Sequence, residues 1–236
     1  MKLTFVKKQH EVGDVWSYFF MPSEDVIFQP GQYLNLTMPD VPPAVADRIF
    51  TIASAPHEAY LQFTSLLGES LFKQKLNSLN EGEVVEADQL GGDFVWQDST
   101  SVSNSTQTIL VNKRLIFIAG GIGVTPFLSI IRDRLYKQLP INASLLYAGR
   151  DDRRPFWDEL LRASELDSTF DIKEYSGIRL TLARLQADIP DINSSLVYLA
   201  GSQVFSETLG EVLIESGHDR SQIKYDYFDG YQDIEY

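Results

Sequence analysis

The chain contains two different patterns of hydrophobic and polar residues. Up to about residue 98, short runs of alternating apolar and polar residues are separated by turn residues, and their β-branched and aromatic content is typical of strands. Residues 70–79 instead have the spacing of a helix, with Ser70 as the expected N-cap. This part of the chain is therefore predicted to be an antiparallel β-barrel with one helix. Its expected strands are 2–9, 14–21, 32–38, 48–54, 60–65 and 83–88.

After residue 113 the pattern changes to short apolar strands that alternate with amphipathic helices. This alternation predicts a C-terminal α/β domain, with a parallel sheet covered by helices on both faces. We therefore expect two domains, 1–112 and 113–236, with a polar exposed loop at 98–108 near their junction. The expected strands are 114–120, 143–149, 170–175, 195–201 and 223–228, and the expected helices are 125–139, 155–166, 181–188 and 206–217.

Composition narrows the classes of protein that fit. The formal net charge of -13 over 236 residues disfavours nucleic acid and anionic membrane surfaces as partners. The absence of cysteine excludes disulfides, a thiolate nucleophile and a cysteine-ligated metal centre, and no metal site is expected. No apolar run approaches the roughly 20 residues of a membrane helix. Because the N-terminus also lacks the pattern of a signal peptide, we expect a cytoplasmic protein.

A glycine-rich turn joins the first strand and the first helix of the second half. In the stretch LIFIAGGIGVTPFLSII, Gly121 and Gly123 begin like the dinucleotide fingerprint G-x-G-x-x-G, but Pro126 stands in place of the third glycine. The backbone N–H groups of such a turn and the dipole of the following helix form an anion site, where Pro126 suits the first helical position. The alternative is a glycine turn without a ligand. Since ligands bind at the carboxyl ends of parallel strands, Gly149–Arg150 and Gly201–Ser202 are expected at the same crevice.

The strand expected at 48–54 carries an unusual combination on one face. Alternation places Arg48, Phe50 and Ile52 on one side and Ile49, Thr51 and Ala53 on the other. An arginine and a phenylalanine on the same face offer a clamp for an anion beside a flat apolar surface. The alternative is a half-exposed strand with one phenylalanine in the core.

The order of these motifs resembles that of the ferredoxin–NADP+ reductase superfamily along nearly the whole chain. FQPGQYLNLTMP is similar to a barrel-strand motif of that superfamily, RIFTIAS to its Arg-x-Tyr-Ser flavin motif, and GESLFKQKL to the start of its pyrophosphate-binding helix. GGDFVWQ is similar to its last barrel strand. IAGGIGVTPF, LLYAGRDDRRPFWDEL and VYLAGSQVF resemble its coenzyme-binding motifs. The resemblance implies an FAD-binding barrel followed by an NAD(P)-binding α/β domain.

The resemblance also implies roles for residues of the first domain. Arg48 is expected to pair with the FAD pyrophosphate, Phe50 to stack on the isoalloxazine, and the Thr51 hydroxyl to hydrogen-bond near the flavin N5. Phe50 replaces the usual tyrosine and so keeps the ring without its hydroxyl. Further FAD contacts are expected from Ile52, Thr64, Gly68 and Ser70. For Ser70 the alternative is a helix cap alone.

In the second domain the resemblance implies binding of the nicotinamide nucleotide. Arg150 is expected near its phosphates, and Gly201 and Phe205 belong to a motif that usually reads Cys-Gly-Pro-Pro-x-Met. Here Ala200 replaces the cysteine that lies beside the nicotinamide. The loop EYSGIRL offers a single arginine, Arg179, for a 2′-phosphate, which favours NADH over NADPH. The expected cradle of the nucleotide consists of Gly120, Gly121, Gly123, Thr125 and Pro126.

The end of the chain resembles the closing strand of the same superfamily. In IKYDYFDGY, Asp226 takes the place of a glutamate, and Phe228 is expected to cover the flavin, with Tyr231 and Tyr236 as other candidates. The resemblance implies that three residues form the reactive group: Thr51, Asp226 and Phe228. Each aromatic residue could instead close the core.

The resulting prediction is an FAD-dependent NAD(P)H oxidoreductase, in which NADH or NADPH delivers hydride to flavin N5. Electrons then pass to an unknown acceptor, which could be a separate redox protein. One alternative is a reductase that uses free flavin as a substrate, which the sequence YLAG favours. Another is a non-catalytic redox or sensory subunit, whose support is the altered motif AGSQ.

Overall fold

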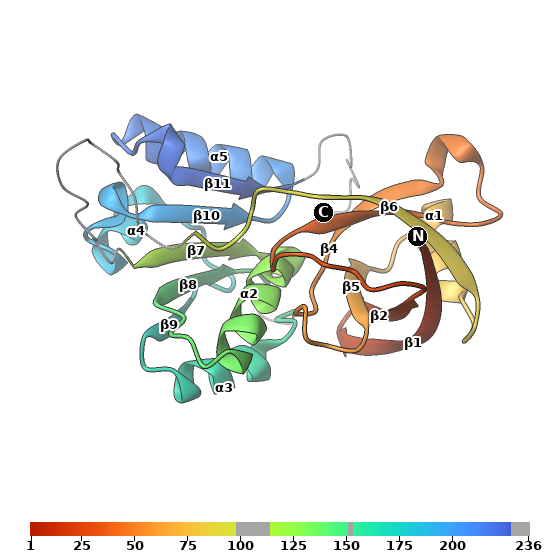
Figure 1. The fold of residues 1–236 in the computed structure, drawn as a ribbon. Coiled ribbons are helices and arrows are strands. Elements are labelled where there is room, and N and C mark those ends of the chain that lie inside the picture. Colours follow the sequence, from red (N-terminus) through yellow and green to blue (C-terminus); the bar gives the residue numbers. More distant parts are fainter. Residues whose placement is uncertain (98–113, 151–152, 228–236) are drawn as a thin grey trace, which may run out of the picture.

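The computed structural model describes residues 1–97, 114–150 and 153–227. The first domain contains an antiparallel sheet and the second a parallel sheet, and the two domains lie side by side (Figure 1). This arrangement confirms the predicted fold class. The expected boundary at 112/113, the expected loop at 98–108 and the aromatic residues Phe228, Tyr231 and Tyr236 lie outside the described residues.

The first domain is a six-stranded antiparallel half-barrel in the order β4-β3-β6-β1-β2-β5. Its strands bury one face around a core that includes Phe20, Leu34 and Phe63. The strands β4 and β5 form the two edges of the sheet, so their ends are available to line a site. The strands are β1 (Lys2–Val12), β2 (Val15–Pro22), β3 (Tyr33–Thr37), β4 (Asp47–Thr51), β5 (Leu61–Leu66) and β6 (Val84–Gly91).

Helix α1 (Leu71–Ser78) follows β5 and covers the half-barrel core with Phe72 and Leu76. The Ser70 hydroxyl accepts a hydrogen bond of 3.3 Å from the backbone N–H of Lys73, which confirms the predicted N-cap. A short 3-10 turn, η1 (Pro43–Val45), precedes β4.

The second domain has five parallel strands in the order β11-β10-β7-β8-β9. Helices α2 and α3 cover one face and α4 and α5 the other (Figure 1). The strands are β7 (Leu115–Gly120), β8 (Ala143–Ala148), β9 (Phe170–Glu174), β10 (Leu196–Ala200) and β11 (Ile223–Asp226). The helices are α2 (Thr125–Tyr136), α3 (Trp157–Leu166), α4 (Leu182–Asp188) and α5 (Gln203–Glu215), with 3-10 turns η2 (Gly121–Val124), η3 (Ile192–Ser194) and η4 (Arg220–Gln222).

The segment after β6 corrects one expectation. GGDFVWQ resembles a last barrel strand, but β6 ends at Gly91 and residues 92–97 form no strand. Instead, Phe94 and Trp96 pack into the core of the second domain, where the ring of Phe94 lies 5.5 Å from that of Phe127. The Tyr198 hydroxyl of β10 donates a hydrogen bond of 2.8 Å to the Val95 carbonyl. Packing of these apolar side chains across the domains therefore overrides strand pairing here.

Candidate functional site

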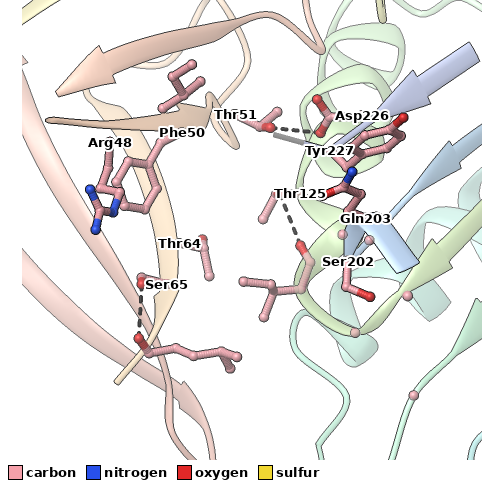
Figure 2. Close-up of a pocket in the computed structure, with 18 of the residues that line it drawn as sticks. Arg48, Phe50, Thr51, Thr64, Ser65, Thr125, Ser202, Gln203, Asp226 and Tyr227 are labelled. Carbon is pink, nitrogen blue, oxygen red and sulfur yellow. Dashed lines mark hydrogen bonds between the residues drawn. The ribbon is translucent and has the colours of Figure 1, made fainter. Parts of the chain in front are cut away.

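A cavity of about 460 Å³ lies where the edge strands of the half-barrel meet the carboxyl ends of the parallel strands. Figure 2 shows Arg48 and Phe50 on one wall and Gln203 and Tyr227 on the opposite wall. The lining residues are Arg48, Ile49, Phe50, Thr51, Thr64, Ser65, Leu66, Phe72, Lys73, Gly120, Gly121, Ile122, Gly123, Thr125, Gly149, Arg150, Arg153, Gly201, Ser202, Gln203, Asp226 and Tyr227.

One wall of the cavity is a flat apolar surface with a cation at its edge. The rings of Phe50 and Phe72 are stacked, with centroids 5.7 Å apart. The Arg48 guanidinium lies over the Phe72 ring at 5.7 Å, so Arg48 and Phe50 share one side of β4, as the alternation predicts. Such a wall fits a planar aromatic ligand that carries a negative charge at one end.

The next residue of β4 points toward the second domain. The Thr51 hydroxyl donates a hydrogen bond of 2.8 Å to the Asp226 carboxylate at the end of β11 (Figure 2). Burial raises the pKa of Asp226 to about 7, although the hydrogen bond from Thr51 works in the opposite direction. Asp226 can therefore gain or lose a proton near neutral pH, beside a hydroxyl that faces both the carboxyl and the cavity.

The glycine turn after β7 is shaped for close backbone approach. Gly121 has a φ of +55°, and a Cβ on Gly123 would lie 2.4 Å from the Ala200 carbonyl oxygen. The Phe205 ring packs behind the turn, where a Cβ on Gly120 would meet it at 2.9 Å. A side chain is thus excluded at positions 120 and 123 and disfavoured by the backbone conformation at position 121, which leaves backbone groups near the start of α2 to face a ligand.

The charge of the cavity differs from that of the chain. Four cationic side chains line it, while Asp226 is the single acidic residue among the lining residues. One of the four, Arg153, also forms an ion pair of 2.9 Å with Asp14 in the first domain. Because the whole chain has a net charge of -13, this local concentration of cations indicates an anionic ligand. The four are Arg48, Lys73, Arg150 and Arg153.

The start of α5 forms the wall that faces Phe50. Ser202 caps this helix by accepting a hydrogen bond of 3.3 Å from the Phe205 N–H. The Gln203 amide and the Tyr227 hydroxyl each donate a 3.0 Å hydrogen bond to the same oxygen of Glu207. Glu207 therefore fixes both lining side chains in place.

Of the predicted site residues that the structure describes, most line the cavity and a few do not. Ile52 is fully buried in the half-barrel core, and Pro126 is buried as the second residue of α2 rather than the first. Gly68 and Ser70 precede α1 and do not line the cavity. The predicted residues that line it are Arg48, Phe50, Thr51, Thr64, Gly120, Gly121, Gly123, Thr125, Arg150, Gly201 and Asp226.

Sequence reasoning assigned no role to several lining residues. Phe72 and Lys73 belong to the predicted helix, and the apolar spacing of that helix is a signal for Phe72. No local signal in the sequence points to Ser65, Arg153 or Tyr227, because tertiary contacts bring them to the cavity.

No family model matches the chain. Flavohemoprotein A of Dictyostelium discoideum is 24% identical over 238 residues, which cover 94% of this chain and 58% of that relative. The chain thus spans little more than half of this curated relative. The flavohem-like FAD/NAD binding domain of nitric oxide dioxygenase from Vibrio cholerae O1 biovar El Tor has a TM-score of 0.74 at 19% identity, covering 96% of this chain and 98% of that chain. Ferredoxin-NADP+ reductase from Plasmodium falciparum has a TM-score of 0.78 at 13% identity, covering 96% and 95% respectively.

The fold is that of these solved structures, in which an antiparallel half-barrel is followed by a parallel α/β domain. The chain has the fold of ferredoxin-NADP+ reductase and of the flavohem-like FAD/NAD binding domain, and its sequence is similar to that of a flavohemoprotein along almost its whole length. The resemblance expected from the motifs is thereby confirmed.

The described residues contain neither a candidate metal site nor a membrane-spanning helix. Within residues 1–97, 114–150 and 153–227, no cluster of three or more histidine, aspartate or glutamate side chains is placed to hold a metal ion. No helix in that part of the chain is long and apolar enough to cross a membrane.

Proposed function

We propose that this chain binds FAD against β4 and the start of α1, and that NADH or NADPH binds at the glycine turn after β7. When bound, FAD supplies the acceptor for a hydride from the nicotinamide ring. Two features of the chain support both ligands: a flat apolar wall with a cation at its edge, and a turn in which a Cβ on Gly123 would collide with the backbone.

Each residue has a separate task in this proposal. Arg48 pairs with the pyrophosphate, and Phe50 provides the surface for the isoalloxazine. Thr51 orients a hydroxyl at the reacting edge of the ring, and Asp226 stores a proton beside it. Arg150 and Arg153 hold the phosphates of the nicotinamide nucleotide.

The contact between Thr51 and Asp226 is the observation that carries the proposal. The flavin motif on β4 and the closing strand β11 come from opposite ends of the chain, yet the two side chains are 2.8 Å apart. They meet inside a cavity that both expected nucleotide sites line.

We further propose that NADH is the preferred coenzyme. Arg154, which precedes α3, donates hydrogen bonds of 2.9 and 3.0 Å to the two carboxylate oxygens of Glu174 at the end of β9. This arginine is therefore already engaged, and the Glu174 carboxylate repels a 2′-phosphate. Arg179 lies beyond on an exposed loop.

The electron acceptor of the module is proposed to be a redox protein or a further redox domain. The flavohemoprotein relative is longer than this chain, which covers 58% of its length. The chain contains no cysteine, so a cysteine-ligated iron–sulfur acceptor would have to lie outside this sequence.

The visible absorption spectrum of the gently purified protein, recorded before and after anaerobic addition of NADH and, in a separate sample, of NADPH, tests the proposed function. Flavin bands that bleach within seconds would support tightly bound FAD and a working path for hydride. Flavin bands that persist with both NADH and NADPH would overturn the catalytic proposal in favour of a sensory subunit. A colourless protein that reduces added flavin would instead indicate a reductase with flavin as its substrate.

A further inference from the structure

A row of polar side chains runs from helix α2 of the second domain to the cavity wall in the first. The Arg132 guanidinium donates a hydrogen bond of 2.7 Å to the Gln62 side-chain oxygen. The Gln62 amide nitrogen donates one of 2.9 Å to the Ser17 hydroxyl. That hydroxyl lies 3.1 Å from the Thr64 hydroxyl, and Thr64 lines the cavity (Figure 2). The four residues therefore connect the domain interface with the ligand site.

The row is buried along its length. The exposed fractions are 0% for Ser17, 2% for Gln62 and 6% for Thr64, and 19% for the Arg132 side chain. On β5, alternation turns Leu61 and Phe63 into the half-barrel core and leaves Gln62 and the threonine on the opposite face. Buried polar groups are costly unless each finds its partner, so this row requires a defined arrangement of donors and acceptors.

The arginine fixes the direction of every hydrogen bond in the row. A guanidinium can only donate, so the Gln62 oxygen must face Arg132 and its NH₂ group must face Ser17. Two carboxylate oxygens of Glu159 hold the other side of Arg132 at 2.6 and 2.8 Å. Burial lowers the pKa of Arg132, but the carboxylates of Glu159, Glu58 and Glu11 together more than compensate, so that its pKa is raised. The donor at the start of the row is therefore permanent.

The remaining proton positions follow from the same rule. Ser17 accepts from Gln62, and its own proton needs an acceptor because the hydroxyl is fully buried. In the part of the chain that the structure describes, that acceptor is the Thr64 oxygen. The Thr64 proton is then free to point into the cavity.

We infer that Arg132, Gln62 and Ser17 form a directional relay that presents the Thr64 hydroxyl to the flavin as a hydrogen-bond donor. The inference rests on the proposed binding of FAD in this cavity. The ligand atom that meets Thr64 is then an acceptor, which means a carbonyl oxygen or an unprotonated ring nitrogen of the isoalloxazine. Arg132, Gln62 and Ser17 are positioning residues, since they act through Thr64.

The relay has a consequence for the reduction potential of bound flavin. Reduction makes the ring richer in electrons, and a donor to an acceptor atom stabilises that form more than the oxidised form. A Thr64 hydroxyl held as a donor therefore raises the potential. The same hydroxyl held as an acceptor would lower it and weaken FAD binding.

Substitution Gln62→Glu reverses the relay with almost no change in shape. A carboxylate at position 62 accepts from both Arg132 and Ser17, so Ser17 must accept from Thr64, which turns the threonine proton away from the cavity. We expect a more negative flavin potential and a roughly tenfold loss of FAD affinity, the value of about one hydrogen bond. Equilibrium titration with FAD and spectroelectrochemistry measure the two effects. An unchanged potential would overturn the inference.

A second variant separates the relay from a simple effect of added charge. In Ser17→Ala the link to Thr64 is cut, so Gln62→Glu made in that background should leave the potential unaltered. A shift of the same size in both backgrounds would mean that the new charge acts directly, and would refute the relay. Asn35→Ala is the matched control, because Asn35 is a buried polar residue of the same sheet that hydrogen-bonds Asp88 outside the cavity. It should lower stability without moving the potential.

The failure of this inference differs from the failure of the proposed function. If the unaltered protein binds no FAD, the proposed function itself fails. If it binds FAD with the same potential in all variants, the relay alone fails.

Discussion

The Thr51 hydroxyl of β4 and the Asp226 carboxylate of β11 are 2.8 Å apart and join the two domains at the cavity. Asp226 is followed along the chain by Tyr227, which also lines the cavity. A hydrogen bond thus links the strand expected to carry the flavin to the last described strand of the second domain. The properties of Asp226 are therefore a sensitive measure of how the domains meet.

Stability should depend on pH through Asp226. Its pKa of about 7 in the folded protein lies above the ordinary value of 3.8, so the folded state favours the protonated form. This contribution is fully present below pH 4 and is lost as pH rises to about 7. In the unaltered protein the free energy of unfolding should therefore decline between pH 4 and 7. We expect this decline to be roughly 1–4 kcal/mol smaller in Asp226→Asn. Urea unfolding of the protein without added nucleotides, at a series of pH values, measures the difference.

A matched carboxylate serves as the control for this experiment. Asp25 is exposed on the segment that follows β2, so Asp25→Asn should retain the decline between pH 4 and 7. An identical pH dependence in Asp226→Asn and in the unaltered protein would show that Asp226 does not titrate in this range.

Arg48→Ala should reduce FAD affinity by about 10- to 100-fold, because a hydrogen bond to a charged group contributes roughly 1.5–3 kcal/mol. Arg48→Lys should recover part of the loss, since an ammonium keeps the charge without the planar fork. Flavin content after gel filtration provides the measurement. Arg114→Ala, at a partly exposed arginine bound to Asp171, is the control. Full flavin content in Arg48→Ala would remove Arg48 from the site.

Gly123→Ala should impair the reaction with NADH more than any effect on folding explains. The new Cβ would lie 2.4 Å from the Ala200 oxygen, and crowding of this kind costs about 1–3 kcal/mol and displaces the turn. Gly82→Ala is the comparison, because Gly82 has a φ of +89° with open space around its Cα. Gly82→Ala should therefore lower the free energy of unfolding through backbone strain alone, by roughly 1–2 kcal/mol. Thermal unfolding and stopped-flow flavin reduction distinguish the two: equal rates in both variants would refute a special role for Gly123.

Glu174→Gln should narrow the preference for NADH over NADPH. Removal of the carboxylate charge lowers the repulsion of a 2′-phosphate and frees Arg154 from its ion pair. The ratio of kcat/KM with NADH to kcat/KM with NADPH is expected to fall by about tenfold or less, since one partly exposed ion pair is involved. Glu165→Gln on α3 is a control of the same charge change. A ratio that stays constant would place coenzyme selection elsewhere.

The sequence was sufficient for the elements whose patterns are local. Alternation identified β4 and the shared face of Arg48 and Phe50, and the parallel arrangement of the strands predicted that the turn at Gly123 would lie at the same crevice as the carboxyl end of β10. Ser70 was correctly predicted as a cap because capping depends on neighbours only three residues away.

Features that depend on distant partners could not be predicted in this way. Gln62 and Ser17 lie in ordinary alternating strands. Their hydrogen bonds depend on the fold, which places Arg132 of α2 beside Gln62. In the same way, the run of residues 92–97 has the composition of a strand, but its aromatic side chains find a better apolar surface in the other domain. Burial against a remote surface outweighs local propensity.

The docking of Phe94 and Trp96 has a consequence for how the module can be divided. Both side chains fill the hydrophobic core beneath α2 and β7, although they follow directly from the half-barrel in the chain. A fragment that starts at β7 would therefore contain a cavity lined by Phe117, Phe127 and Tyr198. A transfer of the second domain to another protein must therefore include residues 92–97 as well as the sheet and its helices.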